Sequence, residues 1–183
     1  MAFYLKVLTV QDNVQLTHAE HERSNTKFPL SIIANDITDP LNVGSLFRLC
    51  DALGIEKLYL CGKTATPPNT KINKTSRSTE KHVDFEYYEN AETLVTELKS
   101  SSIHIISLEI TSLSIAIDSD DFIEATAGKN SACLILGSEN SGVSEALLSL
   151  SDITTHIPMS GKNSSMNVIS AASIACFEIT RNL

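Results

Sequence analysis

Three stretches of the chain place hydrogen-bonding side chains where a ligand can be held. They read DPLNVGSLFRLCDALG, LILGSENSGVS and IPMSGKNSSMNVISAAS, and each lies at the end of a predicted strand. In the third stretch, Ser165 and Asn167 stand at the start of a predicted helix whose next residues are apolar. A helix start offers free backbone N–H groups and the positive end of the helix dipole, so polar residues there can hold a ligand. Capping alone would explain Ser164 or Ser165, but not Asn167, which we place inside the first turn.

The elements that must position these stretches are strands and helices in alternation. Several predicted strands are apolar on both faces, as strands buried in a parallel sheet are. The predicted strands span 30–35, 57–62, 83–88, 103–110, 132–137 and 155–159, and the predicted helices span 43–53, 91–100, 144–150 and 167–181. This order predicts an α/β fold with a mostly parallel sheet flanked by helices. Ligands of such sheets bind beyond the carboxyl ends of the strands, which is where the three stretches lie.

The rest of the chain indicates one domain without an internal linker. We expect this domain to cover residues 30–183, after a short N-terminal extension over 1–29 that holds one strand and one helix. Residues 63–76 are predicted to be a loose segment, because Pro67-Pro68 prevents regular structure locally. No GxGxxG opens a helix after the first strand, which argues against a dinucleotide-binding fold.

The charge of the protein argues against a general nucleic-acid binder. The 183 residues carry a net charge of −8 at pH 7, whereas phosphate contacts usually require a basic surface. Positive charge is concentrated in one segment, where a single acid, Glu80, opposes Lys63, Lys71, Lys74, Arg77 and Lys81. Such a segment is either a local basic face or a solvated loop, and its charge alone does not decide between them.

The cysteines and the start of the chain indicate a cytoplasmic protein without a metal site. Cys50, Cys61, Cys133 and Cys176 lie far apart with no CxxC pair, which is typical of buried reduced thiols. The first residues contain neither a long apolar segment nor a small-residue cleavage site, so we expect no secretory signal. No apolar run is long enough to cross a bilayer, and we predict no membrane contact.

The three stretches together resemble the SpoU/TrmH-type branch of the SPOUT RNA methyltransferases, which transfer a methyl group to a ribose 2′-hydroxyl. The matching residues are Asn42, Arg48, Gly137, Glu139, Gly142, Ile157, Met159, Ser165 and Asn167. All three stretches occur in the family's order, and the resemblance covers residues 30–183. It implies a homodimer and a sheet whose C-terminal part is threaded as a trefoil knot. In the last helix, Ala171, Ala172, Ile174 and Ala175 suit close packing against a second copy or against the core.

The resemblance implies a site for S-adenosylmethionine, held in a bent conformation largely by backbone groups. The matching positions are Leu108, Gly137, Ile157, Met159, Ser165 and Met166. Apolar side chains can enclose the flat adenine ring while backbone N–H and C=O groups bind its polar edge. Gly137 allows a close backbone approach that a Cβ would prevent. Without the resemblance, core packing would explain the apolar members of this set.

The resemblance also implies catalytic roles for Asn42, Arg48, Glu139, Ser165 and Asn167. A ribose hydroxyl is almost un-ionised at neutral pH, so its oxygen needs a base or a group that stabilises the developing charge. Arg48 matches the residue to which the family assigns this task. Because a guanidinium keeps its proton, we expect Arg48 to stabilise the alkoxide and grip the neighbouring phosphate. The alternatives are a surface ion pair for Arg48, a helix N-cap for Asn42 and a loop acid for Glu139.

The basic segment is similar to a family stretch that approaches RNA, except that SRSTE replaces the usual form rich in glycine and alanine. The candidates for phosphate contacts are Lys71, Lys74, Arg77 and Lys81, and solvated loop charges are the alternative reading. Only about thirty residues precede the first stretch, so we expect no extra RNA-binding domain and favour transfer RNA over ribosomal RNA. Two other functions stay open. One is a non-catalytic RNA-binding dimer of the same fold, and the other is a methyltransferase that modifies a base.

Overall fold

A sheet of seven parallel strands forms the centre of the structure, a computed structural model that describes residues 14–15, 17, 20 and 26–183. The strands follow the order β3-β2-β1-β6-β4-β7-β5, and every neighbouring pair is parallel. They are β1 Phe28–Asn35, β2 Ile55–Cys61, β3 Phe85–Tyr88, β4 His104–Leu108, β5 Ile115–Ala116, β6 Ala132–Leu136 and β7 Ile153–His156. The prediction of an α/β fold is confirmed, and the knot stays a prediction.

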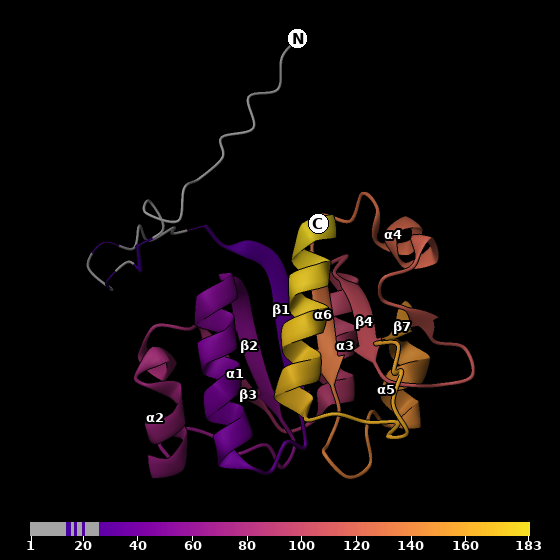
Figure 1. The fold of residues 1–183 in the computed structure, drawn as a ribbon. Helices are drawn as coiled ribbons and strands as arrows, with labels where there is room; N and C mark the ends of the chain where they lie inside the picture. Colours follow the sequence, from indigo (N-terminus) through magenta and orange to yellow (C-terminus); the bar gives the residue numbers. More distant parts are fainter. Residues whose placement is uncertain (1–13, 16, 18–19, 21–25) are drawn as a thin grey trace.

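Helices cover both faces of this sheet (Figure 1). One hydrophobic cluster receives buried side chains from α1 Pro40–Leu53, α2 Thr70–Ser76, α4 Asp120–Thr126 and α6 Val168–Asn182. A second cluster receives them from α3 Ala91–Ser100 and α5 Glu145–Leu150. Ile32 and Ile33, adjacent in β1, belong to opposite clusters and are both fully buried. The strands are therefore apolar on both faces because helices cover both.

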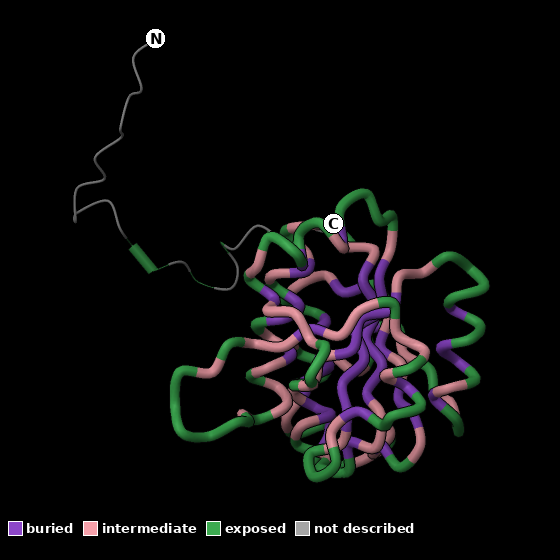
Figure 2. The backbone as a smooth tube through the Cα atoms, turned by 90° about the vertical axis from the view of Figure 1, so that its right-hand side faces the viewer, coloured by how far each residue is buried: buried purple, intermediate pink, exposed green. Residues whose placement is uncertain are grey.

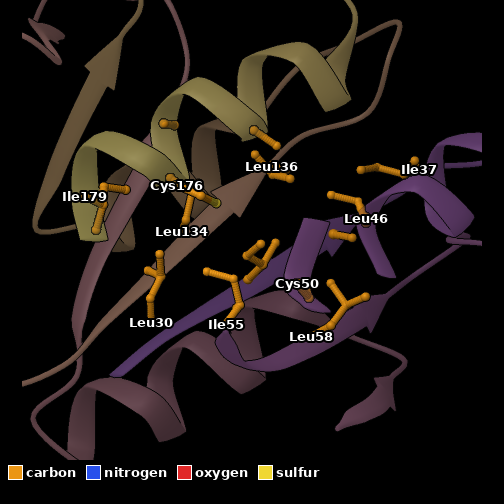
Figure 3. Packing of buried hydrophobic residues seen from close by; sticks show 14 of the residues in the cluster. Leu30, Ile37, Leu46, Cys50, Ile55, Leu58, Leu134, Leu136, Cys176 and Ile179 are labelled. Carbon is orange, nitrogen blue, oxygen red and sulfur yellow. The ribbon is translucent and has the colours of Figure 1, made fainter. Parts of the chain in front are cut away.

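The central strands and the inner sides of the helices form the core, which Figure 2 shows as the buried part of the trace. Cys176 and Ile179 project from α6 toward Leu30 and Leu134 of the sheet (Figure 3). Each fully buried Leu or Ile side chain contributes roughly 1.5–3 kcal/mol to folding. The four cysteines are unpaired and buried, and burial raises the pKa of Cys50 to about 12. These thiols therefore act as packing groups.

The first helix begins three residues earlier than predicted. Asp39 is its N-cap, and its side chain accepts a hydrogen bond from the backbone N–H of Leu41 at 2.9 Å. Pro40 occupies the first turn, where its fixed φ suits the helix and its missing N–H costs nothing. Asn42 is therefore not the N-cap, and its side chain is available for other contacts.

The segment predicted to be loose contains a helix, so this prediction was wrong. Asn69 caps α2, and its side chain accepts hydrogen bonds from the N–H groups of Lys71 and Ile72. Ile72 is fully buried against α1, which anchors the helix. Pro67-Pro68 therefore interrupts regular structure only up to the cap. Because α2 has only seven residues, one buried apolar position left little helical periodicity to detect.

Two further short elements were absent from the prediction. The edge strand β5 has two residues, and α4 has seven, capped by Ser119, which accepts a hydrogen bond from Phe122 N–H. The predicted strand and helix of the N-terminal extension fall mostly outside the described residues, and β1 begins at Phe28, two residues before the predicted domain start. Within the described part of the chain, every helix is too short or too polar to pass through a membrane.

Candidate functional site

A pocket of about 740 Å³ opens at the carboxyl ends of three neighbouring strands. Leu108 ends β4, Leu136 ends β6 and His156 ends β7, and all three residues line it. The loops that follow β6 and β7 form much of the remaining wall. The carboxyl ends of parallel strands meet at one edge, which lies at the bottom of Figure 1. The pocket therefore lies where the rule for open α/β sheets places a ligand.

All six residues predicted to bind the cofactor line this pocket. They come from three places in the chain: Leu108 from β4, Gly137 from the loop after β6, and Ile157, Met159, Ser165 and Met166 from the segment before α6. Their binding roles stay predictions. The structure brings the six together because the sheet order sets β4 between β6 and β7.

Two glycines allow the loop after β6 to fold back on itself. A Cβ on Gly137 would lie 2.1 Å from the carbonyl carbon of Gly142, so no side chain fits there. Gly142 has a φ of +65°, which side chains rarely tolerate. Ser138 and Gly142 exchange two backbone hydrogen bonds, at 3.0 and 3.1 Å. The result is a tight loop whose backbone lines the pocket.

Three predicted catalytic residues form one hydrogen-bonded chain beside the pocket. Asn42 Nδ2 donates to Glu139 Oε1 at 3.0 Å, and Asn167 Nδ2 donates to Asn42 Oδ1 at 3.3 Å. The chain begins at an obligate donor, because Ile169 N–H donates to Asn167 Oδ1 at 2.9 Å. It ends at an obligate acceptor, the Glu139 carboxylate. Both amides are therefore held in one orientation, and the chain joins the first turn of α1, the loop after β6 and the start of α6.

Glu139 is the charged end of this chain. Partial burial of its carboxyl favours the neutral form, but the hydrogen bonds outweigh this effect and lower the pKa below the ordinary value of 4.5. The donors are the Asn42 amide and backbone N–H groups, including that of Thr38 at 3.4 Å. The charged carboxylate is thus the form that the site stabilises.

Asn167 is the N-cap of α6, so its predicted place inside the first turn was wrong. The helix begins at Val168, and the Asn167 side chain accepts the hydrogen bond from Ile169 N–H that a cap accepts. Capping does not use the two N–H donors of the amide group, and one of them donates to Asn42 Oδ1. Ser165 is exposed and lines the pocket two residues earlier. Asn167 therefore combines capping with a contact in the site.

Arg48 is the one predicted catalytic residue that the structure leaves apart from the others. It is exposed on α1 and does not belong to the pocket lining. It follows Asn42 by six residues, which is roughly 9 Å along the helix axis and not the three- or four-residue spacing of a shared face. Among the described residues, its guanidinium has no hydrogen bond or salt bridge, so the surface ion pair is not observed. Its five donors stay free for a ligand.

The predicted RNA-binding residues lie next to α1 rather than in the pocket. Lys71 and Lys74 are exposed on α2, which packs against α1. Arg77 ends α2 with a φ of 53°, and Lys81 is exposed in a short 3₁₀ turn, η2 Thr79–Lys81. These cations and Arg48 share the sheet face that carries α1. Their contact with RNA stays a prediction.

Glu109 and His156 are among the polar residues of the pocket that were missed in the sequence. Glu109 follows β4 and accepts a hydrogen bond from Val143 N–H at 2.9 Å. His156 ends β7, and its Nδ1 lies 2.9 Å from the Ser114 hydroxyl. The usable signal for Glu109 was the single carboxylate in the predicted strand 103–110, near its carboxyl end.

The part of the chain that builds the pocket matches a known protein family. Residues 29–177 match the model of the SpoU rRNA Methylase family. The chain belongs to this family. The match spans the strands, loops and helices that build the pocket, including α1 and most of α6.

SpoU relatives of this chain act on different RNAs. The 23S rRNA (guanosine(2553)-2′-O)-methyltransferase RlmP of Bacillus subtilis (strain 168) is 26% identical over 171 residues, 93% of this chain and 65% of the relative. The tRNA (guanosine(18)-2′-O)-methyltransferase of Thermus thermophilus is 30% identical over 152 residues, 83% of this chain and 74% of the relative. Against three relatives from Bacillus and Staphylococcus, the chain spans 59 to 65% of their length.

The fold of the chain also matches a SpoU structure that holds a methyl donor. The SpoU methyltransferase AviRb from Streptomyces viridochromogenes, crystallised with AdoMet, superposes with a TM-score of 0.72. It is 24% identical, and the alignment covers 85% of this chain and 58% of that one. At 24% identity, this similarity shows that the two proteins share a fold and shows nothing further.

The residues of the pocket fit S-adenosylmethionine. Its volume lies within the range of roughly 300–1,000 Å³ typical of small-molecule sites. Leu108, Ile157 and Met166 would offer apolar surface to an adenine ring, and the glycine loop would offer backbone at close range. Ser165 and Asn167, near the start of α6, would offer polar groups to the amino-acid part.

Proposed function

We propose that this SpoU-family chain is an RNA methyltransferase that uses S-adenosylmethionine to methylate a ribose 2′-hydroxyl. The observation that carries the proposal is the hydrogen-bonded chain of Asn42, Glu139 and Asn167 beside a pocket that fits the cofactor. A non-catalytic RNA-binding dimer does not require such a chain beside a cofactor pocket. The relatives named above act on ribose 2′-oxygens of RNA, which supports the same reaction class.

The side chains of the site would act by orientation and charge. S-adenosylmethionine supplies a methyl group on a sulfonium, which is displaced in line, so correct placement of the attacking oxygen gives much of the rate. The fixed amides of Asn42 and Asn167 would orient the ribose. Arg48, which has no hydrogen bond or ion pair among the described residues, would stabilise the developing alkoxide and bind the adjoining phosphate. Because its guanidinium keeps its proton, we assign it charge stabilisation and not proton removal.

Transfer RNA is the substrate that we favour, and ribosomal RNA is the second candidate. The support for transfer RNA is the relative of 30% identity, of which this chain covers 74%. The support for ribosomal RNA is the relative that aligns over 93% of this chain. In both cases we propose Lys71, Lys74, Arg77 and Lys81 for phosphate contacts, since all are exposed on α2 and η2, which lie beside α1.

We further infer that the chain forms a homodimer through α6 and acts in the cytoplasm. Ala172 and Ala175 are buried inside the protomer, so they serve the core, whereas Ile174 and Phe177 are 44% and 57% exposed on the outer side of α6. Two large apolar side chains in adjacent turns suit contact with a second copy. Four buried unpaired cysteines suit a reducing compartment.

Methyl transfer to defined RNAs tests the proposal. The protein would be incubated with radiolabelled S-adenosylmethionine and either bulk transfer RNA or ribosomal RNA, and the RNA digested to nucleosides. We expect label in 2′-O-methylnucleosides, with transfer RNA preferred. Label in base-methylated nucleosides would reject the ribose reaction, and no incorporation in either RNA would reject the enzyme.

Arg48→Ala separates catalysis from cofactor binding within the same assay. Arg48 lies outside the pocket lining, so the affinity for S-adenosylmethionine should stay within about twofold of wild type. Turnover should fall roughly 100-fold, as when one donor to a developing oxyanion is removed. An unchanged turnover would remove Arg48 from the proposed mechanism.

A further inference from the structure

Glu109 is a pocket carboxylate that contributes to neither the hydrogen-bonded chain nor the predicted cofactor set. It stands directly after β4, and its side chain faces the loop that follows β6. Its Oε2 accepts a hydrogen bond from Val143 N–H at 2.9 Å, and its Oε1 accepts one from Ile110 N–H, also at 2.9 Å. Glu109 thus connects two segments of the pocket wall that are 34 residues apart in the chain.

The glycine loop is shaped around this carboxylate. A Cβ on Gly142 would lie 2.0 Å from Glu109 Oε2, so the carboxylate fills the space that the glycine leaves. Gly142 and Val143 both line the pocket, and Val143 is buried. Glu109 therefore fixes the end of the loop, in addition to the backbone hydrogen bonds within the loop.

Carboxylates line the pocket without a lysine or arginine to balance their charge among the described residues. Among the described residues, its lining contains two carboxylates, Glu109 and Glu139, and neither lysine nor arginine. In this part of the chain the partners of both carboxylates are uncharged N–H donors, so their negative charge is not neutralised by a cation. A pocket of about 740 Å³ is on the order of 10 Å across, so a charge bound in it would lie within about one Debye length of Glu109.

We propose that Glu109 is a cofactor-positioning residue that fixes the glycine loop and makes the pocket favour the charged methyl donor over its product. This inference rests on the proposed function. S-adenosylmethionine carries a sulfonium charge, and S-adenosylhomocysteine, which remains after methyl transfer, is a thioether with one positive charge fewer. A carboxylate that no cation neutralises attracts the first compound more than the second. Glu109 thereby favours donor binding and assists product release.

Calorimetric affinities for the two compounds test this proposal without the reaction. Glu109→Gln keeps the side-chain length and one carbonyl acceptor for Val143 N–H but removes the charge. The preference for S-adenosylmethionine over S-adenosylhomocysteine should fall about two- to fifteenfold, the range expected for one charge at about 10 Å between a dielectric constant of about 80 and one of about 20. Glu109→Ala also removes the acceptor, so it should weaken the binding of both compounds. Glu124→Gln, which changes an exposed residue of α4 outside the pocket, is the control for net charge.

The outcomes separate the inference from the function. If wild type binds neither compound, the cofactor assignment fails and the inference with it. If wild type binds both and Glu109→Gln leaves their ratio unchanged, the charge role is rejected and the proposed function stands. If Glu109→Ala binds S-adenosylhomocysteine as tightly as wild type does, the loop-fixing role is rejected. A ratio that falls in Glu109→Gln but not in Glu124→Gln supports the proposal.

Discussion

At the scale of single residues, Asn167 performs two tasks with one side chain. Its oxygen caps α6 and one of its N–H groups holds Asn42. Asn167→Asp keeps the capping oxygen but loses the donor, whereas Asn167→Ala loses both. We expect Asn167→Ala to lower the free energy of unfolding by about 1 kcal/mol, as other lost caps do. Asn167→Asp should unfold near the wild-type temperature and yet transfer methyl groups more slowly.

Thermal unfolding and a methyl-transfer assay on the same preparations measure this separation. Asn163→Ala, an exposed residue of the preceding loop, is the matched control and should change neither property. Full activity in Asn167→Asp would show that the hydrogen bond to Asn42 has no part in the reaction.

Glu139 gives the site a defined dependence on pH. Burial raises its pKa but hydrogen bonds from Asn42 and backbone N–H groups more than reverse this, so the folded pKa lies below 4.5. A lowered folded pKa means that the stabilising contribution is complete above the unfolded value and is lost as the pH falls through the folded value. The stability difference between wild type and Glu139→Gln should therefore be complete above the ordinary value of 4.5 and shrink as the pH falls below it. Chemical denaturation at several pH values measures it.

Asn42→Ala provides the matching test of the cause. Without its largest hydrogen bond, the pKa of Glu139, followed by NMR titration of its carboxyl group, should rise toward or above the ordinary value. An unchanged titration would mean that the Asn42 contact does not set the charge of this group.

At the scale of elements, α2 is the part of the basic segment that presents cations in fixed positions. Lys74 is exposed in its last turn, and Arg77 ends it with a positive φ. We expect Lys74→Ala combined with Arg77→Asn to weaken RNA binding and to lower the salt slope by roughly 0.7–0.9 for each lost phosphate contact. Asparagine is chosen because it tolerates the left-handed backbone at this position.

Filter binding at several salt concentrations measures both quantities. Lys129→Ala removes an exposed cation just before β6, at the edge of the sheet opposite the pocket, and is the control. If the double variant and the control show the same affinity and slope, the cations of α2 belong to the solvated surface and not to the RNA site.

At the scale of the whole molecule, the outer side of α6 governs the proposed dimer. Ile174→Glu together with Phe177→Glu places two charges on a surface that a second copy would cover, so the dimer should dissociate. Light scattering after gel filtration should report half the wild-type mass. Ile123→Glu, at an equally exposed residue of α4, should leave the mass unchanged. A wild-type chain that is already a monomer would contradict the proposal directly.

The sequence by itself determined the α/β class, the position of every long strand and six residues of the pocket lining. These properties are local, since apolar runs and short motifs express them within a few neighbouring residues. Short elements such as α2, α4 and β5 carry too few periodic positions to be seen in this way. α2 depends on packing against α1, α4 on the burial of Phe122 in the core, and β5 on its pairing with β7.

Only the tertiary structure decided which of the predicted residues meet. Asn42 contacts Glu139 and Asn167 across 97 and 125 residues of chain, and Glu109 contacts Val143 across 34. Such contacts follow from the strand order β1-β6-β4-β7, which brings the corresponding loops to one edge of the sheet. The same order leaves Arg48 outside the pocket, on α1. Hydrophobic periodicity says which face of an element is buried, but it does not say which element becomes its neighbour.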